Sequence, residues 1–199
     1  TGLQIGSGVR PAATQKIFTE GEFKRTDNEL DVAIEGEGFF VITRPSGETA
    51  YTRSGAFKLN STGQMVTSEG FLLSPNITIP TNAVKVNVGT DGTVSVLAAG
   101  AATPTQVGQI TLARFPNAGG LSSLGRNLYA ETVASGAATT GNAGTSGLGT
   151  IAQGFLENSN VSVVDELVAL IEAQRAYEIN SKAIQTSDEM LQVVNNLKR

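Results

Sequence analysis

The C-terminal part of the chain carries the most regular hydrophobic pattern. Val163, Leu170, Tyr177, Ile184 and Leu191 recur at intervals of seven residues, and neither Gly nor Pro interrupts them. Seven residues bring a side chain back to nearly the same face of a helix, so the pattern predicts a long, coiled-coil-like helix. At a rise of 1.5 Å per residue this helix would extend for about 50 Å. A helix of that length requires a partner surface along it.

The repeat defines a predicted assembly seam, in which the heptad positions are joined by a flank of small side chains. The seam comprises Val163, Leu167, Ala169, Leu170, Ala173, Ala176, Tyr177, Ala183, Ile184, Met190, Leu191 and Val194. Small side chains let several helices approach closely, which favours a bundle over a two-stranded coil. The alternative is a helix folded back on its own domain, but the average helix of a globular protein has only about 12 residues.

Polar residues mark the start of the helix and one place along it. Ser162 followed by Asp165 has the spacing of a capping box, whose side chains satisfy amide groups of the first turn. The helix is therefore predicted over residues 162–199. Asn180 and Ser181 lie beside the seam, where they either set the register and number of partners or are tolerated at a solvated edge. The sequence leaves both interpretations open.

Residues 31–133 show a different pattern, in which short β-prone runs alternate with turn signals about every ten residues. The clearest hairpin alternates valines with polar residues over 84–88 and 94–96, around the turn at Asp91 and Gly92. Such spacing is typical of an antiparallel sandwich or barrel-like domain. The predicted strands are 39–43, 51–53, 57–59, 71–73, 77–79, 84–88, 94–97, 109–115 and 128–132.

The remaining segments complete the predicted organisation. Residues 1–30 are polar and Gly-containing and are predicted to form an extended arm. Residues 134–150 contain one large apolar side chain, Leu148, and are predicted to be a flexible loop or to be ordered only by a neighbouring segment. Residues 151–161 are predicted to be a returning strand and linker. The predicted fold is thus mainly β, an antiparallel β domain with an extended N-terminal arm and a coiled-coil-like terminal helix.

Composition excludes several classes of function. The 199 residues include no Cys, His or Trp, which removes the common ligands and nucleophiles, so we expect no enzyme, no catalytic residues, no metal and no cofactor. The 14 Lys and Arg are dispersed in a chain of net charge −4, which argues against nucleic-acid binding. No apolar run is long enough to insert into a membrane, and no secretory signal is recognised.

Three segments resemble the bacterial flagellar axial proteins, a family of rod, hook and hook-associated subunits. They are DVAIEGEGFFVI (31–42), AYTRSGAFKLNSTGQMVTSEGFLL (50–73) and SNVSVVDELVALIEAQRAYEINSKAIQTSDEML (159–191). The opening LQIGSGV with GVRP, and a length too short for the outer domain of a hook subunit, most resemble the distal rod branch of this family.

This resemblance implies a non-enzymatic subunit that polymerises helically into a rigid drive shaft, which transmits motor torque to the hook. The implied partners are further copies of the chain, the proximal rod and hook proteins, and the ring proteins of the peptidoglycan and outer membrane. The rod would cross the periplasm in the flagellar basal body, and its subunits would leave the cell through the flagellar export apparatus rather than by a cleaved signal peptide. The family begins with an N-terminal helix that this sequence lacks, and that helix would pair with the seam.

Two alternatives remain. Within the same family, the chain could be a proximal rod or hook subunit. Outside it, the pattern would also suit a carbohydrate-binding or adhesin-like β module on a helical stalk, although sugar sites commonly use exposed aromatic rings and this chain has no Trp and only 3 Tyr.

Overall fold

The computed structural model describes residue 10 and residues 14–197, and divides the chain into two units, Thr1–Asn160 and Val161–Arg199. Several predicted positions lie outside the described residues: 1–9 and 11–13 of the arm, with the opening LQIGSGV, and 198–199 of the helix. The side chain of Val194 in the seam also lies outside them.

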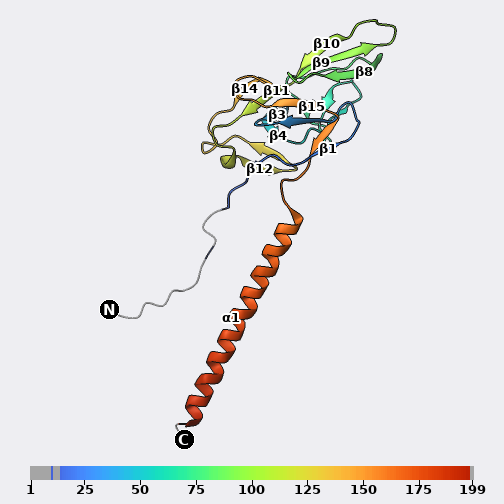
Figure 1. The fold of residues 1–199 in the computed structure, drawn as a ribbon. Helices are drawn as coiled ribbons and strands as arrows, with labels where there is room; N and C mark the ends of the chain where they lie inside the picture. Colours follow the sequence, from blue (N-terminus) through green and yellow to red (C-terminus); the bar gives the residue numbers. More distant parts are fainter. Residues whose placement is uncertain (1–9, 11–13, 198–199) are drawn as a thin grey trace. The chain divides into compact units, whose positions relative to one another are not determined.

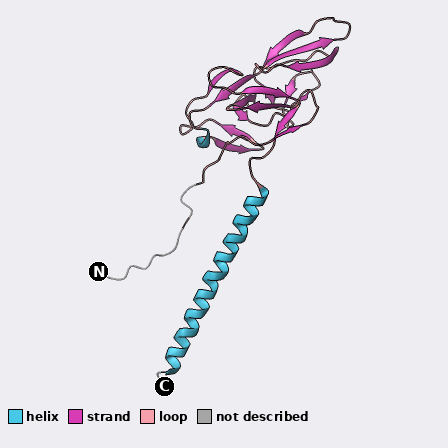
Figure 2. Cartoon of the chain, in the orientation of Figure 1, coloured by secondary structure: helices cyan, strands magenta, loops and turns pink. Residues whose placement is uncertain are grey.

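The first unit is built of antiparallel strands and the second of one long helix (Figures 1 and 2), which confirms the predicted fold class. The helices are η1 (Ala118–Gly120) and α1 (Val163–Leu197). The strands are β1 (Phe23–Arg25), β2 (Val32–Glu35), β3 (Phe39–Thr43), β4 (Thr49–Thr52), β5 (Lys58–Leu59), β6 (Met65–Val66), β7 (Leu72–Leu73), β8 (Ala83–Val88), β9 (Thr93–Ala98), β10 (Thr105–Gln109), β11 (Thr111–Arg114), β12 (Ser122–Gly125), β13 (Leu128–Ala130), β14 (Thr139–Asn142), β15 (Thr150–Gln153) and β16 (Phe155–Glu157).

The strands of the β unit form four sheets among the described residues. The largest runs β12-β13-β4-β3-β7-β6-β5, and β11 joins it by pairing with both β3 and β14. A second sheet has the order β10-β9-β8, and the pairs β15-β2 and β1-β16 make the others. The strand pairings among the described residues are antiparallel, and short turns connect half of the paired neighbours, such as β3 with β4 and β8 with β9.

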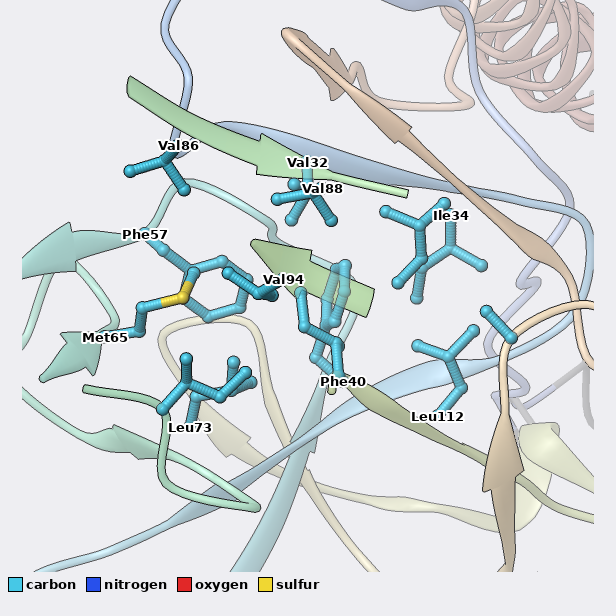
Figure 3. Packing of buried hydrophobic residues seen from close by; sticks show 14 of the residues in the cluster. Val32, Ile34, Phe40, Phe57, Met65, Leu73, Val86, Val88, Val94 and Leu112 are labelled. Carbon is cyan, nitrogen blue, oxygen red and sulfur yellow. The ribbon is translucent and has the colours of Figure 1, made fainter. Parts of the chain in front are cut away.

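Strand β3 explains how these sheets share a core. Phe40 and Ile42 are fully buried, while Phe39 and Val41, which point to the opposite face, are 4% and 7% exposed. A strand covered on both faces has a continuous apolar run rather than an alternating one, as in the sequence FFVI. Phe40 enters the main core, where its ring meets that of Phe57 edge-on at 5.2 Å between centroids (Figure 3).

The predicted strands are largely found, with instructive differences. Residues 109–115 do not form one strand, because β10 ends at Gln109 and β11 begins at Thr111. Residues 77–79 make only an isolated bridge between Thr78 and Gln64. Strands β1, β2, β6, β10, β12 and β14 were not predicted, and most of them are short or lack apolar alternation.

Residues 134–150 are not a flexible loop but follow the other interpretation, in which a neighbouring segment orders them. Strand β14 pairs with β11 through a register that joins Thr111 to Asn142, and Leu148 and Ala143 are buried in the main core. Ser135 is fully buried, and its hydroxyl donates to the carbonyls of Thr132 and Gly136. Pairing with β11 and burial of Leu148 and Ala143 in the main core therefore order this segment.

The part of the predicted arm that the structure describes is extended, and it lies against the β unit. Phe18 packs edge-on against Phe39 and Tyr129, at 5.3 and 5.0 Å between centroids. Strand β1 then pairs with β16. The side-chain amide of Asn160 donates to the carbonyl of Thr19 at 3.1 Å. The arm is thus held against the segment by which the chain leaves the β unit.

A partly buried ion pair fixes this junction. Arg53 Nε donates to Glu157 Oε2 at 2.8 Å, and the two side chains are 15% and 12% exposed. The guanidinium also donates to the carbonyls of Ile34 at 3.2 Å and Gly36 at 2.9 Å. The other oxygen of Glu157 accepts the amide of Gly21 at 3.1 Å, and a side chain on Gly21 would collide with the backbone of the exit segment. One charged pair therefore connects the core sheets, the exit strand and the arm.

Removing the carboxylate of Glu157 should loosen this junction. We expect Glu157→Ala to lower the free energy of unfolding by about 1–3 kcal/mol, because Arg53 loses its charged acceptor while its carbonyl acceptors remain. Hydrogen exchange of the Gly21 amide should also become faster. Arg25→Ala, which breaks the exposed Arg25–Asp27 pair, is the control and should change stability by at most about 0.5 kcal/mol. Unchanged exchange at Gly21 in the Glu157 variant would contradict the assignment.

The buried phenol of Tyr51 should make the β unit sensitive to alkali. Burial raises its pKa, and the nearby carboxylate of Glu131 raises it further. An unfolded Tyr ionises near pH 10, so above that pH the unfolded chain releases this proton before the folded chain does. The stabilising contribution is therefore complete below about pH 10 and is lost as the pH rises toward the pKa of the folded state.

Urea unfolding at several values between about pH 8 and pH 11 tests this dependence. Tyr51→Phe should lose stability less steeply above pH 10 than the native chain does. Tyr177→Phe, at an exposed position of α1, should retain the native slope. Equal slopes for the native chain and Tyr51→Phe would show that this phenol does not govern the alkaline response.

Candidate assembly surface

Helix α1 contains 35 residues from Val163 to Leu197, and every side chain that the structure describes in it is exposed. The hydroxyl of Ser162 accepts the amide of Asp165 at 3.4 Å, and its carbonyl accepts the amide of Glu166. Ser162 thus caps the first turn, and Asp165 with Glu166 places negative charge at the positive end of the helix dipole.

The large side chains of the predicted seam are on the surface along the whole helix. Their exposed fractions run from 54% at Leu167 to 77% at Tyr177. The alanines of the seam are exposed as well. An ideal helix drifts by about 20° per heptad, so the heptad positions from Val163 to Leu191 wind about 80° around the axis. The seam is a shallow spiral rather than a straight stripe.

The seam has a different flank on each side. Val164, Val168 and Ile171, the valine flank, lie roughly 80–140° from Val163 around the axis. They are 69%, 50% and 49% exposed and were not included in the predicted seam. The alanine flank, Ala169, Ala173, Ala176 and Ala183, lies roughly 80–160° away in the opposite direction. The apolar surface therefore extends toward the valine flank near the start of α1 and toward the alanine flank further along the helix.

Several polar side chains within this surface already have partners in the helix. The hydroxyl of Thr186 donates to the carbonyl of Lys182, and that of Ser187 to the carbonyl of Ala183, both at 2.9 Å. Such bonds satisfy hydroxyl groups without water. Ser187 lies between Ala183 and Met190 on the helix surface, so it can enter an apolar contact there. Asn180 and Ser181 are exposed, and their role stays a prediction.

Features of other function classes are sparse in the described part of the chain. It has no cluster of three or more His, Cys, Asp or Glu able to hold a metal ion. The carboxylate of Glu37 forms an ion pair with Arg114 at 2.6 Å. None of the described helices is both long and apolar enough to cross a membrane. Among the described residues of the β unit, Phe23 is an exposed large aromatic.

Two regions of the sequence match known families. Residues 33–96 match the family described as the flagellar hook protein FlgE/F/G D1 domain. Residues 152–197, which include the whole of α1, match the C-terminal region of the flagellar basal-body rod FlgEFG proteins. The first region covers the centre of the β unit, and the second covers the returning strands and the predicted seam.

The relatives are similar over nearly the whole chain. The flagellar basal-body rod protein FlgG of Buchnera aphidicola subsp. Schizaphis graminum is 50% identical over 197 residues, which are 99% of this chain and 76% of the relative. FlgG of Caulobacter vibrioides is 50% identical over 198 residues, with 100% and 76% covered. The flagellar hook protein FlgE of Salmonella typhimurium is 37% identical over 194 residues, 94% of this chain but 46% of that protein. The chain belongs to the FlgE/F/G family of flagellar hook and basal-body rod proteins.

Proposed function

We propose that this chain is a structural subunit of the distal rod in the flagellar basal body, and that it polymerises helically into the rigid shaft that transmits motor torque to the hook. One observation supports this most directly: α1 exposes an apolar seam along its whole length in a chain that is half identical to basal-body rod proteins. A helix with this surface is stable and soluble only when other helices cover it.

The two flanks of the seam indicate how many neighbours α1 needs. A single partner helix covers one side, so it would leave either the valine flank or the alanine flank in water. Burial of a large apolar side chain contributes about 1.5–3 kcal/mol, which is a strong reason for both sides to be covered. We infer that each α1 contacts at least two neighbouring helices, as in the interior of a tube rather than in an isolated pair.

The alanine flank supports close packing in such an assembly. Small side chains allow helix axes to approach to the lower end of the usual 8–10 Å. Closely spaced helices that interlock along their length resist bending and twisting together, because no helix can rotate without displacing its neighbours. This property suits a shaft under torque.

The fraction of each relative's length that this chain covers favours a rod subunit over a hook subunit. The chain covers 76% of the rod proteins of Buchnera and Caulobacter, but 46% of the longer hook protein of Salmonella. We propose that its partners are copies of itself and the related rod and hook proteins. Contacts with ring proteins of the peptidoglycan and outer membrane, passage across the periplasm and delivery by the flagellar export apparatus belong to the same proposal, and rest on family membership alone.

Charged substitutions in the seam test this function. We expect Leu170→Asp and Ile184→Asp to abolish assembly of the distal rod and swimming, because a buried unpaired carboxylate costs several kcal/mol at each subunit contact. The circular dichroism of the β unit should not change. Basal bodies isolated from a strain that carries only the variant gene, and viewed by electron microscopy, report on assembly.

Gln185→Asp is the matched control for Ile184→Asp. It introduces the same charge one residue further along, where α1 presents Gln and Glu side chains rather than the seam. This variant should assemble rods and support swimming. Rods of normal length in the Leu170→Asp strain would refute the seam, and assembly of some other structure by the native chain would refute the proposed function.

A further inference from the structure

The β unit exposes large apolar side chains in separate places. Apart from Ile17 and Phe23 in the arm and β1, those described are Leu59 and Val84, which line one hollow, Leu124 in β12, and Val133 in the turn after β13. Isolated exposed apolar residues are ordinary, but a pair beside a hollow, or one held on a rigid turn, marks a candidate contact surface.

Val133 is a fixed projection, which we call the knob. Its relative exposure is 104%, so no part of its side chain is covered. The turn that carries it is nevertheless tightly bonded: the amide of Thr132 donates to the hydroxyl of Ser135 at 2.9 Å, and the hydroxyl of Thr132 donates to the carbonyl of Gly120 at 2.7 Å. The side-chain amide of Asn117 donates to the carbonyl of Ala134 at 3.1 Å. These hydrogen bonds fix the turn, which holds the apolar side chain of Val133 in solvent.

A hollow of about 540 Å³ lies between the turn after β5 and strand β8, and we call it the socket. Its apolar wall consists of Leu30, Leu59, Ile79, Pro80, Ala83 and Val84. Leu59 and Val84 on its rim are 41% and 69% exposed, whereas Ile79 is buried at 3%. The socket is larger than one valine side chain, so it can receive the neighbouring residues of a turn as well.

The knob and the socket are at different ends of the β unit. The knob is bonded to η1, which leads directly into β12, the edge strand of the largest sheet. The socket lies along β8, the edge strand of the three-stranded sheet. Figure 1 shows β12 and β8 at opposite ends of this unit. The knob of a chain therefore cannot reach its own socket.

An exposed charge of opposite sign lies beside each feature. Glu131 is exposed two residues before the knob, where one of its carboxylate oxygens accepts the amide of Ala138 at 3.2 Å. In the socket wall, Asp27 pairs with Arg25, and a carboxylate oxygen of Glu29 accepts the amide of Val86 at 2.8 Å. Lys85 is exposed there and forms no ion pair with any described residue.

We propose that the knob of one copy of this chain enters the socket of the next copy, with Glu131 facing Lys85. The contact joins two different surfaces, so it is head to tail, and repetition of it builds an open helical polymer rather than a closed dimer. The inference rests on the proposed function, which requires such a polymer, and adds the surface by which neighbouring β units recognise each other.

Cysteine cross-linking tests the contact cleanly, because the native chain has no Cys. Rods assembled from the full chain with Val133→Cys and Val84→Cys together should give a ladder of dimers, trimers and higher species with a short bismaleimide. The pair Val133→Cys and Leu59→Cys should do the same. Each single variant should give no cross-linked species. A mixture of the Val133→Cys and Val84→Cys subunits should stop at cross-linked dimers, because each subunit carries only one cysteine.

Controls separate this contact from polymerisation in general. Val133→Cys combined with Ser46→Cys, an exposed residue of the turn between β3 and β4, should give no ladder. Dimers from the Val133→Cys variant alone would indicate a symmetric contact and overturn the proposal. Rods that assemble normally but give no ladder with either socket cysteine would overturn it while the rod function stands, and failure of the native chain to form any rod would overturn both.

A charge exchange provides a second test in the same rods. Glu131→Lys or Lys85→Glu alone should lower the yield of the cross-link about two- to fivefold, as expected for an exposed ion pair. The double exchange should restore the yield. Equal yields in all four backgrounds would show that the two charges do not face each other.

Discussion

The apolar surface of α1 is the constraint on which the rest of the molecule depends. An isolated helix of this length has modest stability in water, and in proteins most helical stability comes from packing of an apolar face. In α1 every described side chain is exposed, including large apolar residues along its whole length. We therefore propose that other chains complete the helical unit, and that its stability depends on assembly.

The β unit has the opposite character, because it satisfies its own contacts. Both faces of β3 are covered, the arm is fixed by Phe18, and the Arg53–Glu157 pair joins the core sheets to the exit strand. Among the described residues, no buried side-chain polar atom lacks a hydrogen-bond partner. We expect a unit of this kind to fold without a neighbour and to stay rigid when force is applied to its exit segment. In the proposed rod, α1 thus supplies the cohesion between subunits and the β unit supplies stiffness.

The sequence predicted the features that local patterns determine. The start of α1 at Ser162 follows from capping chemistry and strand β3 from the apolar run at 39–43, whereas the role of the seam stays a prediction. The partner that orders residues 134–150 could not be predicted, because β14 pairs with β11 and Leu148 packs into the main core only in the folded unit. The valine flank was missed because a strict seven-residue search follows a single row. An i, i+4, i+7 search beginning at Val164 would have found it.

The two proposed contacts differ in what they can specify. Apolar burial along α1 is strong but weakly directional, since a helix with exposed apolar side chains on several sides can slide by one heptad and bury a similar area. A rigid knob in a socket contributes less area but permits one position, and its charged pair penalises the wrong partner. A shaft needs both properties, because cohesion without register would let subunits slip under torque. We therefore expect the helical layer to provide the strength of the polymer and the β units to fix its symmetry.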